Sequence, residues 1–260
     1  MDDSAKLVAT LPDEVTVKVV GLGGVGCALL DHLAVFLRST GKIVRLVLID
    51  GDEFEPLKNS KRMRFNAVGN KAEVKAEEVR STLGDATYIT VVAIPEYITK
   101  DNIERLIKTN DIVFLCVDNH PTRKLVSDHV GTLSDCTLFS GGNEGVDPPK
   151  ERGTYGNAQI YFRKGGVDKT VPLGKFHPEI ANPKGKMPTE MDCIEMAFSL
   201  PQILFANIAV AGAMLNMFYT LLCGKLTYQE VKFDILEGRS MPQLSVKQEL
   251  SLCEKDSASS

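Results

Sequence analysis

The sequence predicts an α/β fold in which a parallel sheet is extended by antiparallel strands in the C-terminal half. Apolar strand segments alternate with amphipathic helical segments through about the first 145 residues, a pattern typical of parallel strands joined by crossover helices. A glycine cluster joins the first strand to the first helix, as in Rossmann-like nucleotide-binding folds. After residue 145 the alternation stops and loop-rich sequence begins.

Each element of the first half follows from its local pattern. The strands are short apolar and β-branched runs, and the first helix repeats leucine at helical spacing through Leu29, Leu33 and Leu37. Pro121 stands in the first turn of the last helix, where proline is tolerated. The expected strands are 15–22, 43–52, 87–94, 111–118 and 137–142, and the expected helices are 24–40, 70–83, 100–109 and 121–133.

The second half predicts a different organisation within the same domain, so that 1–145 and 146–240 are its two halves. A glycine- and proline-rich loop leads to a strand at 158–164, and the four prolines of 165–192 indicate a long crossover or mobile loop. A long helix and a last strand are expected next, and then a flexible tail. These three segments cover 193–223, 228–236 and 241–260.

Composition and charge exclude several classes of function. The chain has 260 residues, 43% of them hydrophobic and 25% charged, and a net charge of -4 that gives no reason to expect nucleic acid or a basic membrane patch. The six cysteines form no C-x-x-C pair, so we expect no structural zinc and a cytoplasmic location. The apolar segment 203–223 contains Asn207 and Asn216 and lacks a basic flank before it, so a buried helix is favoured over a membrane span.

The glycine cluster indicates a phosphate site. Gly21, Gly23, Gly24 and Gly26 follow an expected strand and begin an expected helix, where they allow phosphate to approach backbone N–H groups. Asp50 ends the second strand about 24 residues beyond them, a position from which an acid accepts hydrogen bonds from ribose hydroxyls. These features fit adenosine nucleotides generally and do not separate NAD from ATP.

The residues that follow Asp50 favour ATP. Cations that converge on phosphates neutralise a triphosphate and stabilise the charge of a leaving pyrophosphate, whereas a dehydrogenase does not need them there. The stretch beyond Asp50 supplies an asparagine and several such cations, namely Asn59, Lys61, Arg62, Arg64, Lys71 and Lys75.

Four motifs in chain order resemble those of the ThiF-type, ubiquitin-activating-enzyme-like adenylyltransferases, which include the enzymes that serve sulfur carriers in molybdopterin and thiamine biosynthesis. GLGGVG, DGDEFEPLKNSKR, GNKAEV and CVDNHPTR are similar to the family patterns G-x-G-x-x-G, D-x-D with N-x-x-R, G-x-x-K-A and C-x-D-N-x-x-x-R. The resemblance covers about residues 15–145. A weaker similarity continues in the helical segment that begins near Asp192.

The resemblance implies a role for each matching residue. The four glycines line the phosphates of ATP, Asp50 holds the ribose, and Asn59 and Arg62 contact the phosphates. Lys71 stabilises the phosphate charge and is favoured over Lys75, although it stands one residue early in its motif. Asp118 binds Mg²⁺, a hard cation shared with phosphate oxygens. Arg123 is either structural or a contact for an acidic chain terminus.

The activity that the resemblance implies is ATP-dependent adenylation of the C-terminal carboxylate of a ubiquitin-like or sulfur-carrier protein that ends in glycine. The carboxylate is already ionised, so positioning and charge stabilisation matter more than a general base, and His120 is expected to be a surface or supporting residue. Cys193 lies close to the thioester-forming cysteine of some relatives. Activation at a helix N-terminus and simple core packing both stay open for it.

The assembly and three other functions also stay open. Some relatives are homodimers in which a partner's N-terminal arginine completes the site, but no arginine precedes Arg38 here, so Lys6, Lys18 or nothing takes that place. A ThiF-like tRNA-carboxylate dehydratase is disfavoured by the acidic charge balance. An NAD-dependent oxidoreductase lacks a hydride-handling His or Lys constellation, and a nucleotide-binding protein without catalysis requires Asp118 or Arg62 to be misplaced.

Overall fold

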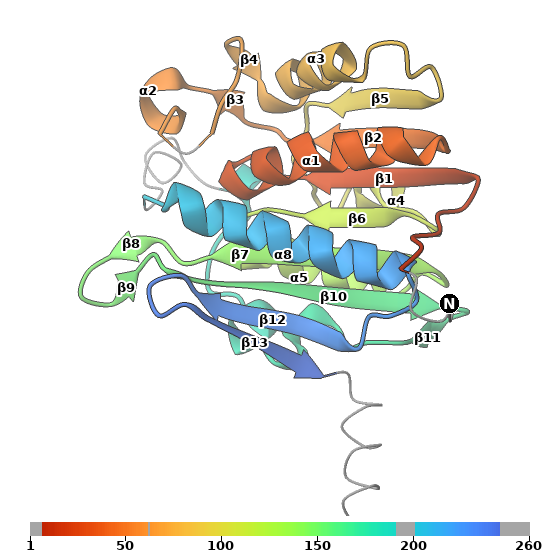
Figure 1. Ribbon diagram of the computed structural model, residues 1–260. Coiled ribbons are helices and arrows are strands. Elements are labelled where there is room, and N and C mark those ends of the chain that lie inside the picture. The colour runs from red at the N-terminus through yellow and green to blue at the C-terminus, as the bar shows by residue number, and fades with distance from the viewer. Residues whose placement is uncertain (1–6, 62, 191–200, 245–260) are drawn as a thin grey trace, which may run out of the picture.

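The computed structural model describes residues 7–61, 63–190 and 201–244 and shows a mixed central sheet with helices on both faces (Figure 1). The strand order is β13-β12-β10-β7-β6-β1-β2-β5, and β11 pairs with β10. The strands of this sheet are β1 (Glu14–Val20), β2 (Ile43–Ile49), β5 (Ile89–Ile94), β6 (Ile112–Leu115), β7 (Cys136–Asn143), β10 (Tyr155–Lys164), β11 (Val167–Asp168), β12 (Tyr228–Asp234) and β13 (Arg239–Leu244).

Two directions of strand pairing divide the sheet. The strands from β5 through β2, β1 and β6 to β7 are parallel, whereas β10, β12 and β13 continue the sheet in antiparallel fashion. The predicted fold class is therefore confirmed. The strand order reverses at β1, with β2 on one side and β6 on the other, and ligands of open α/β sheets bind beside such a point.

The helices and short strands complete the chain. The longer helices are α1 (Gly24–Thr40), α3 (Lys71–Leu83), α5 (His120–Val130) and α8 (Leu204–Leu222), and the shorter ones are α2 (Pro56–Asn59), α4 (Ile103–Leu106) and α6 (Pro178–Ala181). Two small antiparallel pairs join β3 (Glu53–Phe54) to β4 (Gly69–Asn70) and β8 (Val146–Asp147) to β9 (Glu151–Arg152).

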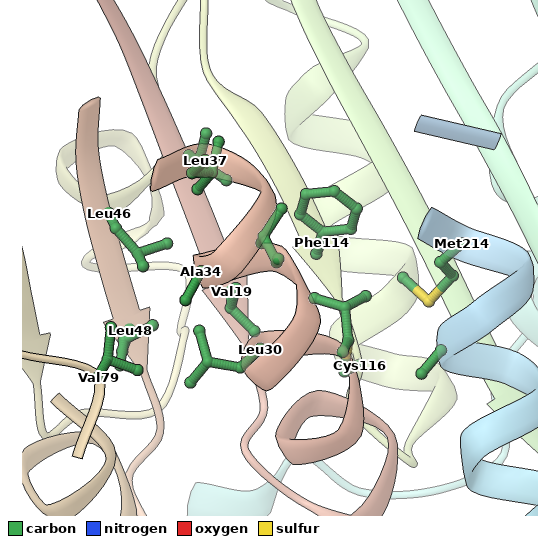
Figure 2. Packing of buried hydrophobic residues seen from close by; sticks show 14 of the residues in the cluster. Val19, Leu30, Ala34, Leu37, Leu46, Leu48, Val79, Phe114, Cys116 and Met214 are labelled. Atoms are coloured by element: carbon green, nitrogen blue, oxygen red, sulfur yellow. The ribbon is translucent and has the colours of Figure 1, made fainter. Parts of the chain in front are cut away.

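The core forms two apolar layers, one on each face of the sheet. Helices α1, α3 and α8 cover one face, and α4, α5 and α6 cover the other. Leu29, Leu33 and Leu37 of α1 are fully buried, as their spacing predicts. Figure 2 shows α1 packed between strand and helix residues on either side, which include Leu46, Leu48, Val79, Phe114 and Met214.

Helix α8 is half buried rather than fully buried. By length and composition it is the one helix in the described ranges that could cross a membrane, with 19 residues, a mean hydropathy of 1.5 and 39% of its apolar window buried. Its inner face packs on α1, β7 and β10, whereas Phe205 and Ile208 are exposed. The expectation of a wholly buried helix was thus too strong.

Several element boundaries differ from the prediction. Helix α8 begins at Leu204 and not at residue 193, because residues 201–203 are not helical; residues 191–200 lie outside the described part. Strand β12 is not the last strand, since β13 follows it and extends to Leu244, into the expected tail. Pro242 and the exposed side chains of β13 give no apolar alternation from which a strand is predicted.

The segment after β10 lies against α5. The Leu173 N–H donates to Ser127 Oγ at 3.2 Å, and the Thr122 hydroxyl lies 3.7 Å from Met187 Sδ. His177, just before α6, bonds to Glu230 Oε1 of β12 at 2.8 Å. The segment expected to be a crossover or mobile loop is therefore held to both α5 and the sheet within its described residues.

Candidate functional site at the carboxyl ends of the parallel strands

The glycine turn between β1 and α1 uses its four glycines for different purposes. Gly21 has φ +86 and lies against the backbone of β6's end, and a Cβ added at Gly26 would lie 1.9 Å from the Gly21 oxygen. A Cβ at Gly24 would lie 2.1 Å from Asn207 Nδ2. At Gly23 a Cβ would meet no atom of the described residues within 4 Å. Three glycines are thus required by packing, and Gly23 leaves open space beside the start of α1.

The start of α1 suits an anion. Its N-cap residue is Gly23, which makes no side-chain cap, and its first turn contains no acidic residue. The unpaired N–H groups and the positive end of the helix dipole therefore remain available at this edge of the sheet. An anion that reaches Gly23 would meet donors without displacing a side chain.

Asp50 ties the glycine turn to the end of β2. Its Oδ2 accepts the Leu22 N–H at 2.5 Å, and its Oδ1 accepts the Asp52 N–H at 2.8 Å. Burial raises the pKa of Asp50 to about 6, against the lowering effect of the Lys71 cation. The residue expected to hold a ribose thus also fixes the conformation of the turn, and its carboxyl group is almost covered.

A charged cluster lies beside Asp50. Lys71 Nζ contacts Asp52 Oδ2 at 2.7 Å, and the Tyr97 hydroxyl donates to Asp52 Oδ1. Burial raises the pKa of Tyr97, and the hydrogen bond to Asp52 raises it further. Gly51 leaves room for the tyrosine, because a Cβ there would lie 2.6 Å from its ring. Lys71 is buried, so water screens its charge only weakly and the charge acts more strongly on nearby groups of this site.

Asn70 joins this cluster to α3. Its Oδ1 accepts the N–H groups of Ala72 and Glu73, which caps the helix, while its Nδ2 donates to the carbonyls of Asp50 at 3.0 Å and Asp52 at 3.1 Å. A single side chain therefore fixes where Lys71, the first residue of α3, enters the site.

Asp118 and Arg123 follow β6 and have different roles. Asp118 is exposed, and its carboxylate has no hydrogen-bond or ion-pair partner among residues 7–61, 63–190 and 201–244. Arg123 is buried and donates to the carbonyls of Val117 and Gly141, both at 2.9 Å. Of its two expected roles, Arg123 takes the structural one, because it holds the ends of β6 and β7 together.

The remaining predicted residues are Asn59 and Lys75, which make contacts of their own, and residues outside the described part. Asn59 is buried, and its Oδ1 accepts the Glu55 N–H at 2.9 Å. This oxygen therefore bonds to the residue that immediately precedes α2. Lys75 pairs with Glu78 at 2.7 Å, and its Nζ lies 4.8 Å from the centroid of the Phe65 ring. Arg62 and Cys193, as well as Lys6, lie outside the described residues.

Lys18 does not suit the expected contribution to a partner's site. It is buried in β1, where its ammonium pairs with Asp111 at 2.6 Å and donates to the Leu106 carbonyl. Removing it from these contacts would leave Asp111 buried without a cation, which is costly. The structure therefore corrects the suggestion that Lys18 replaces an N-terminal arginine.

The sequence reasoning missed Asp52, Asn70 and Tyr97 as site residues. Asp52 is the second acid of the D-x-D pattern, so the sequence motif could have identified it. Tyr97 had no sequence signal, because only the fold brings the end of β5 beside the end of β2. No group of three or more His, Cys, Asp or Glu side chains in the described ranges could hold a metal alone, but Mg²⁺ commonly takes one carboxylate together with phosphates and water.

Curated proteins are similar to this chain in sequence. Over 116 residues the chain is 35% identical to the adenylyltransferase and sulfurtransferase MOCS3 of Danio rerio. The matched region covers 44% of this chain and 24% of that protein. It is 30% identical over 115 residues to the protein HesA of Leptolyngbya boryana, covering 44% and 39% respectively. The chain thus spans between about a quarter and two-fifths of the length of these curated relatives.

Solved structures share the fold. The E. coli MccB structure with ATP matches with a TM-score of 0.60 and 17% identity over 89% of this chain and 64% of that one. The structure of PaaA matches with a TM-score of 0.61, also at 17% identity, over 90% and 64%. The model of the ThiF family matches residues 12–255, which is nearly the whole chain. With its glycine turn, its D-x-D loop and Lys71 at one sheet edge, this chain belongs to the ThiF family.

Proposed function

We propose that the protein is an ATP-dependent adenylyltransferase that activates a carboxylate of a carrier protein or peptide. The observation that carries the proposal is the open approach at Gly23 together with the buried Lys71, which pairs with the more exposed Asp52 at the carboxyl ends of the parallel strands. Lysine and helix N–H groups stabilise phosphate charge without any general base. MOCS3 is an adenylyltransferase by name, and the similar structure of MccB contains ATP. Both similarities support the same chemistry.

In the proposed reaction a carboxylate oxygen of the substrate attacks the α-phosphorus of ATP. A bond forms between that oxygen and phosphorus while the bond to the bridging oxygen of pyrophosphate breaks, and pyrophosphate leaves with the electron pair. Helix α1 and Lys71 would stabilise the charge on the phosphates. Asp118, exposed beside the turn, would supply the carboxylate for Mg²⁺, which when bound neutralises phosphate charge.

The finer parts of the proposal concern the substrate and the assembly. We infer a ubiquitin-like or sulfur-carrier protein with a C-terminal glycine as the substrate, a homodimer as the assembly and the cytoplasm as the location. Arg62 would contact the phosphates, and Cys193 is the candidate for a later thioester. The alternative substrate is a carboxylate of modified tRNA.

Exchange of labelled pyrophosphate into ATP tests the proposal. We expect exchange that depends on a small protein ending in Gly-Gly. The exchange rate should fall by about 100- to 1,000-fold in Lys71→Met, since that variant removes the buried charge beside the phosphates. Lys75→Met is the matched control, because Lys75 is a buried lysine of the same helix that pairs with Glu78 instead. Asp118→Asn should lower the rate of exchange and raise the Mg²⁺ concentration that exchange requires, because the variant lacks the carboxylate for the cation. NADH binding without any exchange would reject the proposal.

A further inference from the structure

A buried asparagine without a hydrogen-bond partner lies against the glycine turn. Asn207 is 0% exposed, and its Nδ2 and Oδ1 both lack partners within the part of the chain that the structure describes. A Cβ added at Gly24 would lie 2.1 Å from Nδ2 and 2.7 Å from Cγ, so the carboxamide points at the first residue of α1. Buried carboxamides are almost always hydrogen-bonded, so this one requires a partner that the described chain does not supply.

The same place is where two helix N-termini meet. Asn207 belongs to the first turn of α8, and α1 and α8 lie side by side and run in the same direction (Figure 1). Neither helix has a side-chain cap or an acidic residue in its first turn. Two positive dipole ends placed together disfavour each other unless an anion lies near both.

We propose that Asn207 and the N-terminus of α8 form a second wall of the polyphosphate site, and that Asn207 Nδ2–H donates to a phosphate oxygen. Gly24 is required because any Cβ would separate the carboxamide from the turn. Since Asn207 is covered, contact with phosphate needs a small movement of the Gly23–Gly24 turn. The inference rests on the proposed function for the nucleotide, but a site between two helix ends also binds inorganic tripolyphosphate.

Calorimetric titration of the full chain with ATP, inorganic tripolyphosphate and adenosine tests this inference. Asn207→Leu should bind ATP and tripolyphosphate about 10- to 100-fold more weakly, as expected for loss of a hydrogen bond to a charged group, and bind adenosine as the wild type does. Without nucleotide its Tm should equal or exceed the wild-type value, because leucine removes an unpaired buried polar group. Asn207→Ala, which avoids any excess of volume, repeats the binding test should leucine not fit.

Asn216→Leu is the matched control, since Asn216 is an exposed asparagine of the same helix, and it should bind all three ligands normally. Wild-type affinity for ATP in both Asn207 variants would overturn the inference, as would an equal loss for adenosine or a wild type that binds neither ATP nor tripolyphosphate. A wild type whose tripolyphosphate binding depends on Asn207 but which shows no pyrophosphate exchange would support the inference and reject the proposed adenylation.

Discussion

Two kinds of N-terminus occur among the four longer helices that the structure describes. Helices α3 and α5 are capped by asparagine side chains, since Asn70 accepts the N–H groups of Ala72 and Glu73 and Asn119 accepts that of Thr122. Helices α1 and α8 have no side-chain cap, and Asn207 in the first turn of α8 is buried without a partner in the described ranges. Asparagine therefore caps α3 and α5, whereas the Asn207 side chain in α8 has no hydrogen-bond partner in the described ranges.

Folding alone meets part of the hydrogen-bonding requirement at the capped ends, whereas the proposed phosphate would meet it at the uncapped ends. A capped end is complete without any other molecule, and its cap contributes to stability. The two open ends converge at the turn around Gly23 and Gly24, beside the Lys71–Asp52 pair. Such an arrangement costs stability in the chain by itself and favours an anion at that place.

The largest expected effects come from replacing glycines of the open end. Gly26→Ala should lower the free energy of unfolding by about 3 kcal/mol or more, because its Cβ would lie 1.9 Å from the Gly21 oxygen. Gly23→Ala should leave that free energy within about 0.5 kcal/mol, since its Cβ would contact no residue that the structure describes. It should nevertheless weaken ATP binding about 100-fold by filling the phosphate approach. Urea unfolding and calorimetric titration measure both; a Gly26→Ala variant as stable as the wild type would contradict the packing argument.

A second prediction concerns Asp50, which anchors the open end. Its pKa of about 6 in the folded chain exceeds the ordinary aspartate value of 3.8, so its contribution to stability is fully present below about pH 4 and is lost as the pH rises through 6. The difference between the two values corresponds to at most roughly 3 kcal/mol. Relative to Asp50→Asn, which does not titrate, the wild type should therefore lose stability between about pH 4 and pH 6. Parallel stability curves for the two proteins would rule this out.

The smallest expected effect is at a capped end. Asn119→Ala should lower the free energy of unfolding by about 1 kcal/mol, because the Thr122 N–H loses its acceptor. Affinity for tripolyphosphate should not change, the reverse of the pattern expected for Asn207→Leu. Chemical unfolding and titration of both variants side by side give the comparison; a cap variant that loses tripolyphosphate affinity would remove the distinction between the two kinds of end.

Much of the fold could be predicted because local patterns determine it. Helix α1 was predicted to the residue at 24–40, since its leucines keep one buried face and Gly41 ends it in a left-handed conformation. Strand β13 was missed because its exposed side chains carry no alternation, and its pairing with β12 alone makes it a strand. The start of α8 was misplaced because no capping residue marks it.

The fold class, the glycine turn and the positions of Asp50 and Lys71 could be predicted from the residues alone, because they follow from periodicity and from motif spacing along the chain. The side chains that complete the site depend on contacts between distant segments. Tyr97 reaches Asp52 across β5 and β2, and Asn207 reaches Gly24 from a helix nearly two hundred residues away. Whether a polar group is satisfied depends on such distant neighbours, so spacing along the chain carries no record of it.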